Sequence, residues 1–527
     1  MSGWARPLSW LCLVLVLFAI VPGLTATAAQ DDDANVLTIA LEAEPRLLDP
    51  LIDDTVVFHT LQRLVYEPLV NLAADTAEPA PLLAESWTVS DDGTEYTFTL
   101  QQGVTFHDGT PFNAEAVKYS IDRVKGVNVF AAPLIKSVED VEVVDDQTVT
   151  MHLGAADPTI LQALHWVFMV SPTAFQENEQ DGDWAKAWAA ENMVGTGPYT
   201  LEQWDRGAQL VFTRYDDYWR GWEDGQFETI ISRYVPERAT QRLLVEQGDV
   251  DIAFHLTEDD LQALRDNSEV TVFEYAGLKA GHIGFNTTKG LTADPLIRQA
   301  IAYAFPRDDM IAALQDIGLP ANGPYPETLI GSFGGELPGY QYDLDRAREL
   351  LAEAGHADGG FSLELVYYNG WPWEELAATL LQASLQQLNI TVDLVGSEWP
   401  PMYERLLKPE TAPDMYGFGS AAWLIDPSAA FGPHFSCASR GTGGYNWMHY
   451  CNPELDRLVD QARVTSDPEE RLQLYQEATR IVAEDAPWFT THIEKSAWAT
   501  GNGIQGMYSN PVWASENIVD FYSLSKA

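Results

Sequence analysis

The stretch of sequence that decides the fold is residues 81–124, PLLAESWTVSDDGTEYTFTLQQGVTFHDGTPFNAEAVKYSIDRV. Its first half predicts a half-buried hairpin with strands at residues 86–90 and 96–100, because apolar and polar side chains alternate along the second segment. The turn between them is Asp91-Asp92-Gly93, in which glycine tolerates the positive φ that such turns need. The sequence therefore predicts antiparallel sheet at this point of the chain.

The second half of the same stretch predicts a short strand followed by a helix. The strand is expected at residues 104–106 and ends at the turn residues 107–111. Asn113 has a side chain that can cap the first turn of the helix, and Glu115 lies where a carboxylate stabilises the positive end of the helix dipole. None of these residues predicts chemistry on a substrate, so the stretch indicates a scaffold.

The N-terminus has the features of a cleaved secretory signal. Arg6 precedes an apolar segment at residues 11–21, and Ala26-Thr27-Ala28 provides the small residues of a cleavage site. We therefore expect residues 1–28 to be removed and the mature chain to be periplasmic or otherwise extracytoplasmic. Lipid anchoring at Cys12 is the lesser alternative, because the usual small residue before a lipid-modified cysteine is missing. No later stretch is long and apolar enough to span a bilayer.

The chain is strongly acidic: 78 Asp and Glu against 30 Lys and Arg give a formal net charge of −48 over 527 residues. Such a surface repels nucleic acid and anionic lipid, so we expect neither as a partner. A charged tail does not explain the charge, because the acidic residues are spread over the whole length. An acidic surface suited to high salt explains it best, since the Debye length near 1 M salt is only about 3 Å. An ordinary acidic exported protein is the alternative.

Two cysteines, Cys437 and Cys451, remain after the leader is removed. A disulfide between them is favoured in an exported protein, and closing a loop of that length stabilises the fold by about 3 kcal/mol in the chain-entropy model. Two thiolates alone offer too few ligands for a tetrahedral metal site. We therefore expect the disulfide.

Helix and strand patterns alternate throughout, which predicts an α/β fold. The clearest unit is residues 361–394, where two alternating strands flank a segment with apolar residues at helical spacing, as in a βαβ unit. Further strands are expected at residues 37–41, 230–236 and 250–254, and further helices at 61–69, 240–247, 345–354 and from Pro468 onward.

Several segments together resemble one family. The opening stretch, the segment Gly195-Thr196-Gly197-Pro198-Tyr199 and residues 285–304 resemble the family 5 solute-binding proteins of ABC transporters, the peptide and nickel receptors. The last segment departs from the family pattern at Phe305-Pro306-Arg307, where Ile-Asp-Arg is usual. The resemblance covers essentially the whole mature chain.

The resemblance implies a two-lobed periplasmic-binding-protein-like fold of type II, in the large peptide-binder subclass, with an extra subdomain inserted in the first lobe. Two crossing strands, near residues 282–286 and 495–499, are expected to form the hinge. The implied function is that of a monomeric receptor that carries a small-molecule or peptide ligand to the membrane permease subunits of an ABC importer. By this analogy lobe I consists of residues 30–80, 200–283 and 497–527, the inserted subdomain of 81–199, and lobe II of 284–496.

A search for catalytic residues finds no convincing set. Residues 417–421, GFGSA, resemble a nucleophile elbow only loosely because the final glycine is missing. No His-Glu-x-x-His motif occurs, and the histidines near the expected ligand segments are His282, His434 and His449. We expect no enzyme activity, no cofactor and no metal. An exported hydrolase and a chemosensory receptor are the alternative classes.

The resemblance and the aromatic residues together predict the ligand-binding surface. The turn Leu48-Asp49-Pro50 matches the family's turn after the first strand and places the next few residues at ligand contacts. In lobe II, aromatic residues surround the end of a strand at 368–373, where open α/β sheets bind ligands. The segment 414–451 resembles the region that lines the family's cavity. We therefore expect the substrate-binding residues to be Asp54, Thr55, Val56, Tyr368, Trp371, Trp373, Phe418, Trp423 and Asp426.

One position departs from the peptide receptors that the chain resembles. They hold the α-ammonium group of the peptide with an aspartate three residues before an Asp-Pro pair, and Trp423 occupies that place before Asp426-Pro427. A buried ammonium without a carboxylate loses a charge-assisted hydrogen bond and keeps its desolvation cost, on the order of a few kcal/mol. Asp54 is a substitute anchor in one interpretation and a solvated surface residue in the other.

By the resemblance, the expected ligand is a di- or oligopeptide or a peptide-like compound. The tryptophan at position 423 raises an oligosaccharide, an opine-like compound and an organic cation as alternatives, because aromatic faces suit sugar rings and cations. Each of the aromatic rings can instead simply pack within its lobe.

Overall fold

The computed structural model describes residues 35–52, 56–74, 76–128, 131–254, 256–315, 318–321, 323–326, 329, 340–515 and 517–526. The expected signal peptide at residues 1–28 lies outside them, as do Asp54 and Thr55. Among the described residues, no helix is both long and apolar enough to cross a membrane.

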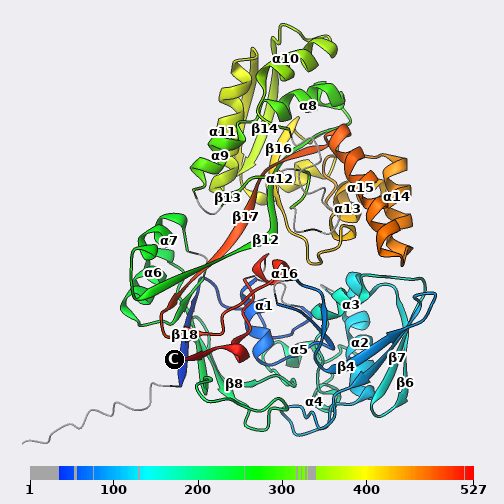
Figure 1. Ribbon diagram of the computed structural model, residues 1–527, viewed down its shortest axis with the longest axis vertical. Coiled ribbons are helices and arrows are strands. Elements are labelled where there is room, and N and C mark those ends of the chain that lie inside the picture. The colour runs from blue at the N-terminus through cyan, green and yellow to red at the C-terminus, as the bar shows by residue number, and fades with distance from the viewer. Residues whose placement is uncertain are drawn as a thin grey trace, which may run out of the picture. The chain divides into compact units, whose positions relative to one another are not determined.

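Two long strands, β12 (Val270–Phe285) and β17 (Trp488–Gly501), run side by side through the described fold (Figure 1, green and orange-red). They are antiparallel and pair from Val270 opposite Gly501 to Gly284 opposite Trp488. The large sheet continues on both sides of them, in the strand order β15-β14-β16-β12-β17-β11-β1-β10-β9-β8. The segments expected to cross near residues 282–286 and 495–499 thus belong to the pair that joins the two halves of one sheet.

The pairing of β12 with β17 is interrupted between Ala276 and Ala280, where β12 bulges. The N–H of Leu278 in this bulge donates to Ser515 Oγ of α16 (Pro511–Ser515). A Cβ atom at Gly277 would lie 2.9 Å from the same oxygen, so a side chain larger than hydrogen does not fit there without a shift. Because a bulge locally bends its strand, this point redirects β12 between the two halves of the sheet.

We refer to the two halves of the large sheet, with the elements packed on them, as lobe I and lobe II. Lobe I contains β1 (Val36–Leu41), β2 (Val70–Leu72), β3 (Pro79–Pro81), β8 (Tyr199–Asp205), β9 (Gln209–Arg214), β10 (Thr229–Tyr234), β11 (Ile252–Ala253), β18 (Ile504–Gln505), β19 (Ser525–Lys526), α1 (Val56–Leu61), α6 (Arg238–Gln247), α7 (Glu258–Arg265) and α16. Lobe II contains β13 (Gly318–Leu319), β14 (Phe361–Tyr368), β15 (Ile390–Ser397), β16 (Met415–Ser420), α8 (Pro295–Tyr303), α9 (Arg307–Ala313), α10 (Leu344–Glu353), α11 (Pro372–Gln386), α12 (Trp399–Leu406), α13 (Ser428–Phe435), α14 (Pro453–Val464) and α15 (Pro468–Asp485).

The βαβ unit expected at residues 361–394 is confirmed. β14 and β15 are parallel neighbours, from Phe361 opposite Ile390 to Tyr368 opposite Ser397, and α11 lies between them in the chain. The helices expected at 240–247, at 345–354 and from Pro468 onward are present as α6, α10 and α15. The strands expected at 37–41, 230–236 and 250–254 are present as β1, β10 and β11, with shifted ends.

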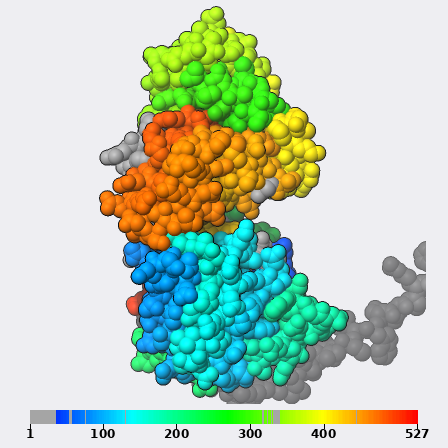
Figure 2. Space-filling model, turned by 90° about the vertical axis from the view of Figure 1, so that its right-hand side faces the viewer, coloured from blue at the N-terminus to red at the C-terminus, as the bar shows by residue number. Residues whose placement is uncertain are grey.

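A separate four-stranded antiparallel sheet, in the order β4-β5-β7-β6, contains the opening stretch. β4 (Ala84–Val89) and β5 (Glu95–Leu100) form the expected hairpin, with Gly93 at a φ of +69° in the turn. Asn113 accepts a hydrogen bond from the Ala116 N–H and caps α2 (Ala114–Val127), as expected. The other elements are β6 (Val138–Asp145), β7 (Thr148–Leu153), α3 (Ile160–Ala163), α4 (Pro172–Glu177) and α5 (Lys186–Ala189), and Figure 2 shows this part of the chain as one contiguous blue-to-teal surface.

Two expectations about local structure are wrong. Residues 104–106 form only a single bridge, Thr105 with Pro111, because the chain turns back at once through the bonds Gly109 N–H to Phe106 O and Phe106 N–H to Thr110 O. The helix expected at 61–69 instead runs from Val56 to Leu61 and continues as a 3-10 turn to Leu64. Pro68 excludes the last part of the expected helix, since a proline disfavours helical conformation in the residue before it.

A buried ion pair connects the turn after β1 to the helix of the four-stranded sheet. Asp49 accepts hydrogen bonds from Arg123 Nη1 at 3.0 Å and from Arg123 Nη2 at 2.5 Å, and both side chains are fully buried. Arg123 Nε donates to the carbonyl of Trp184 at 2.9 Å, and the guanidinium lies 4.6 Å from the ring centroid of Phe175. Breaking such a pair costs about 3–5 kcal/mol, because the remaining charge is buried without compensation.

A second buried carboxylate, Glu67, joins three segments that are distant in sequence. It accepts hydrogen bonds from Tyr218 OH at 2.7 Å, Thr196 Oγ1 at 2.8 Å and Trp219 Nε1 at 3.0 Å. Burial raises the pKa of Glu67 to about 7, although these three bonds act to lower it. Thr196 belongs to the Gly195–Tyr199 segment, so Glu67 fixes that segment beside α1.

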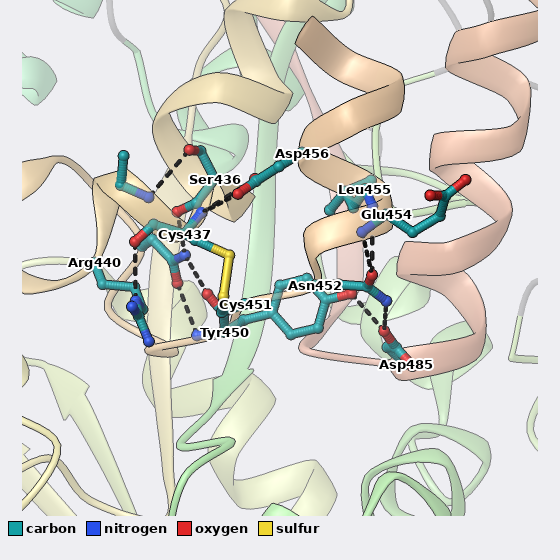
Figure 3. The surroundings of a disulfide bond; sticks show 12 residues. Ser436, Cys437, Arg440, Tyr450, Cys451, Asn452, Glu454, Leu455, Asp456 and Asp485 are labelled. Atoms are coloured by element: carbon teal, nitrogen blue, oxygen red, sulfur yellow. Dashed lines mark hydrogen bonds between the residues drawn. A yellow bond between two sulfur atoms is a disulfide. The ribbon is translucent and has the colours of Figure 1, made fainter.

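The expected disulfide between Cys437 and Cys451 is confirmed (Figure 3). The N–H of Cys437 donates to the carboxylate of Asp456 on α14 at 3.2 Å, and Arg440 Nε donates to the carbonyl of Cys437 at 2.9 Å. Beyond Cys451, the side chain of Asn452 donates to Asp485 Oδ2 at 2.9 Å. The bond therefore closes a loop whose two ends are anchored to α14 and α15.

We predict that Glu67→Gln flattens the pH dependence of stability. Between the usual pKa of about 4.5 and the raised value of about 7, the folded chain binds more protons than the unfolded chain, so this group makes stability fall as pH rises. The contribution of Glu67 to the stability of the folded state is complete below pH 4.5 and is lost as pH passes 7. The variant should reduce the slope by up to about 1.4 kcal/mol per pH unit, measured by denaturant unfolding from pH 4 to 8.

The control for Glu67→Gln is Glu85→Gln on β4, which removes the same charge from an exposed position. An unchanged slope in Glu67→Gln, or an equal flattening in Glu85→Gln, contradicts the assignment of this pH dependence to Glu67.

We also predict that replacing both cysteines by serine lowers the free energy of unfolding by up to about 3 kcal/mol, because the unfolded chain loses a loop constraint. Dithiothreitol should produce the same loss in the parent protein and no further loss in the double variant. Equal denaturation midpoints for the parent and the double variant would show that the bond does not stabilise the fold.

Candidate ligand-binding site

Aromatic side chains gather at the carboxyl ends of β14 and β15. The ring of Tyr368 at the end of β14 lies 5.7 Å from that of Trp371 and 6.2 Å from that of Trp399. Trp371 and Trp373 are stacked, with ring centroids 6.1 Å apart and an interplanar angle of 22°. Trp371 is 43% exposed, so it offers an aromatic face to a ligand, whereas the other three rings are partly buried.

Glycines in β16 and β12 allow two of these rings to lie against the sheet. Gly419 pairs with Gly281 across the two strands. A Cβ at Gly419 would come within 3.1 Å of the Trp371 ring, and one at Gly281 within 2.8 Å of the Trp373 ring. The glycines of the sequence GFGS therefore serve close packing of aromatic rings on the sheet.

Glu374 holds the loop that presents these rings. It lies in the first turn of α11, is 1% exposed, and accepts a hydrogen bond from the Tyr368 N–H at 2.7 Å. Burial raises the pKa of Glu374 to about 7. Glu374 was not among the expected site residues, because in sequence it is an ordinary acidic residue at the start of a helix.

Phe418 lies on the other face of the sheet from Trp371 and Trp373, because successive residues of a strand point to opposite faces. It is 2% exposed, and its ring lies 5.0 Å from His282 and 5.2 Å from Trp488. The structure therefore places Phe418 in the core, away from Trp371 and Trp373. Phe418 belongs to the same aromatic cluster as Tyr368 and Trp399, because its ring lies 6.3 Å from that of Trp447, which in turn lies 5.6 Å from that of Trp399.

The histidines near the expected ligand segments have partners within the chain. His282 Nε2 lies 2.7 Å from Ser420 Oγ, His434 Nδ1 donates to a carbonyl at 3.0 Å, and His449 Nε2 donates to a carbonyl at 3.0 Å. Burial lowers the pKa of His434 to about 4 and that of His282 well below its usual value. Within the described ranges, no group of three or more His, Cys, Asp or Glu residues has the arrangement of a metal site.

Trp423 lies between the two lobes. Its carbonyl accepts a hydrogen bond from Trp166 Nε1 at 2.9 Å, and its side chain is partly buried against the aromatic core of lobe II. Trp166 belongs to a 3-10 turn that follows α3, in the segment that carries the four-stranded sheet. Sequence reasoning missed Trp166, because it stands in an apolar run that reads as core.

Asp426 is already engaged by side chains of lobe II. Arg471 Nη2 lies 2.5 Å from Asp426 Oδ2, and Tyr475 OH donates to Asp426 Oδ1 at 3.3 Å. The N–H of Ser428 donates to the same Oδ1 at 2.9 Å, and Asp426 is 1% exposed. Its carboxylate thus fixes the start of α13 against α15.

A buried cation lies on the lobe I side of Trp166. The guanidinium of Arg63 rests 5.8 Å from the ring of Trp166 and 5.4 Å from that of Trp513, and its Nη2 donates to His165 Nε2 at 2.6 Å. Trp513 Nε1 donates to the same His165 nitrogen at 2.9 Å. Because an indole N–H can only donate, this nitrogen of His165 accepts, and the imidazole is therefore neutral. Burial lowers the pKa of Arg63 to about 9.

The remaining expected contacts follow β1. Asp54 and Thr55 lie outside the described residues, and Val56 is described only as the first residue of α1. The structure therefore brings together the rings of Tyr368, Trp371 and Trp373. Trp423 packs on the same aromatic cluster as Tyr368, and the carboxylate of Asp426 is bound by Arg471 and Tyr475.

The chain is similar to binding proteins with several ligands. It is 29% identical over 526 residues to the probable D,D-dipeptide-binding periplasmic protein DdpA of Escherichia coli (strain K12), with 98% of each chain covered. It is 29% identical over 490 residues to heme-binding protein A of Haemophilus influenzae, with 88% of each chain covered. The solved structure of HbpA2 from Haemophilus parasuis has a TM-score of 0.83 and 26% identity, over 94% of this chain and 100% of that chain.

These similarities agree with the described fold. The structural neighbours are two-lobed periplasmic binding proteins, which confirms the expected fold class, and an extracytoplasmic location agrees with the periplasmic relatives. Residues 78–442 match the family described as bacterial extracellular solute-binding proteins, family 5 Middle. Sharing its fold and most of its length with these relatives, the chain belongs to the family 5 bacterial extracellular solute-binding proteins and is a ligand-binding receptor.

Proposed function

We propose that the chain is the exported receptor of an ABC importer, and that its ligand is a small peptide-like compound without a free α-ammonium group. Residues 1–28 are cleaved on export. The monomeric receptor closes lobe I and lobe II around the ligand and delivers it to the permease subunits, with no bond broken. In this proposal lobe I comprises 30–80, 200–283 and 497–527, with 81–199 inserted, and lobe II comprises 284–496.

The observation that carries this proposal is the absence of a spare carboxylate at two described positions. Position 423 is tryptophan, and the Asp426 carboxylate is held by Arg471 and Tyr475. An ammonium group placed beside them would lose its hydration without gaining a charged partner. A ligand whose amine is acylated, or that has no amine, avoids this loss.

The charge on the lobe I side supports the same class of ligand. Arg63 lies against Trp166, whose indole donates to the Trp423 carbonyl. A cationic ligand beside this contact is disfavoured by like charge, whereas a carboxylate or a neutral polar group is attracted. Arg63, whose charge is partly offset by the nearby carboxylate of Asp520, is compatible with the carboxylate end of a peptide.

The exposed face of Trp371 supports an apolar or planar portion in the ligand. Its ring is stacked with that of Trp373, with centroids 6.1 Å apart, and the two rings lie over Gly419 of β16 and Gly281 of β12. Aromatic contacts of this kind contribute without a charged anchor. Ligand contacts made by both lobes favour closure, and moving a two-state equilibrium from mostly open to mostly closed needs about 5 kcal/mol of differential binding.

We predict that Trp423→Asp creates affinity for free-amino dipeptides. The new carboxylate offers a charge-assisted hydrogen bond worth about 1.5–3 kcal/mol, which corresponds to a roughly 10- to 100-fold lower Kd. The measurement is titration calorimetry with matched dipeptides that carry either a free or an N-acetylated amine, at one fixed high salt concentration. The parent receptor should prefer the N-acetylated member of each pair.

The control is Val144→Asp, which adds the same charge to β6 at a position that is 54% exposed. It should leave the affinity for both members of each pair unchanged. Tighter binding of free-amino dipeptides by the parent receptor would contradict the proposed ligand class, and binding of sugars alone would favour the oligosaccharide.

A further inference from the structure

A cavity in lobe II contains an arginine to which the described residues offer no anionic partner. Arg307 begins α9 and lines this cavity together with Tyr340, Trp488, Phe489 and Thr490. The cavity holds about 340 Å³ of empty space, part of it open to solvent. It therefore has room for a small bound group.

Three polar atoms of the described lining are buried and have no hydrogen-bond partner among the described residues. They are Arg307 Nε, Arg307 Nη1 and Thr490 Oγ1. The guanidinium lies 5.8 Å from the ring centroid of Phe489, and burial lowers the pKa of Arg307 to about 10. Buried donors that are left unpaired are rare in folded proteins and destabilise them, so this group requires an explanation.

Other buried arginines of the described chain have acceptors. Arg123 is paired with Asp49, and Arg298 on the neighbouring helix α8 donates to the carbonyls of Thr292, Asp485 and Ala486. The acidic residues next to Arg307 in sequence, at 308 and 309, are exposed. Arg307 is thus unlike these two, because it lines a cavity and two of its donor nitrogens have no acceptor among the described residues.

We propose that this cavity binds a small monovalent anion, a halide or a short carboxylate, held by the Arg307 guanidinium and the Thr490 hydroxyl. The donors fit this class, because one guanidinium neutralises a single negative charge and the hydroxyl can donate a further hydrogen bond to it. A phosphate or sulfate would require further donors, and the described walls contributed by Trp488 and Phe489 are largely apolar.

The charge of the chain makes this site easy to recognise in solution. A protein with a formal net charge of −48 disfavours the adsorption of anions on its surface. A saturable rise of the melting temperature with an anion at constant ionic strength therefore indicates a specific anion-binding site. The site lies on the part of lobe II that carries α9 and β17, and its readout needs no transported solute, so its failure leaves the proposed receptor function untouched.

The experiment is a thermal unfolding series in which sodium gluconate is replaced stepwise by sodium chloride, or by sodium acetate, at constant ionic strength. The melting temperature should rise and saturate with at least one of the two anions, because binding to the folded state stabilises it by mass action. Saturation by chloride alone identifies a halide site, and saturation by acetate alone identifies a carboxylate site. The absence of a saturable rise with either anion overturns the proposal.

Two variants and a control attribute the response. Arg307→Met should abolish it, and Thr490→Val, which keeps the shape of the side chain, should move half-saturation to roughly tenfold higher anion concentration. The control Arg457→Met removes a guanidinium that is 55% exposed on α14 and should respond like the parent. If Arg307→Met does not fold, an unchanged half-saturation in Thr490→Val still overturns the proposal.

Discussion

The pairing of β12 with β17 is the constraint on which the rest of the structure depends. These two strands are the neighbours through which the lobe I strands and the lobe II strands form one sheet. Within lobe I the pair is reinforced by Glu274, which accepts from Arg265 of α7 and from Lys495 of β17. Toward lobe II the pairing breaks at the bulge held by Ser515. The pair is therefore reinforced within lobe I and interrupted by a bulge toward lobe II.

Buried charges position the segments around this pair. The Asp49–Arg123 pair and the Glu67 carboxylate both connect residues that lie far apart in sequence, and both have hydrogen-bond partners on more than one side. Pairs of this kind contribute little net stability compared with apolar residues, but they tolerate few alternative arrangements. They therefore specify how the turn after β1, the Gly195–Tyr199 segment and α2 come together.

Local structure was predictable from the sequence where one pattern dominated. Alternation with Gly93 gave the hairpin, Asn113 gave the cap of α2, and the βαβ unit at 361–394 followed from its periodicity. The strand at 104–106 was not predictable, because the turn that follows it is too tight to continue a ladder. Among the site residues, the grouping of Tyr368, Trp371 and Trp373 was predictable from their spacing. The contacts of Phe418, Trp166 and Arg63 were not, because they depend on strand face and on distant segments.

We propose that this receptor has aromatic and backbone contacts at position 423 in place of a charged anchor for its ligand. Family membership leaves the ligand open, since the relatives include proteins named for a dipeptide and for heme. The most direct test is mass spectrometry of the solute released from receptor purified from its own host without denaturation. We expect the released solute to be a compound that does not react with an amine-specific reagent. An unmodified dipeptide with a free α-amine, recovered in a one-to-one ratio with the protein, would contradict it.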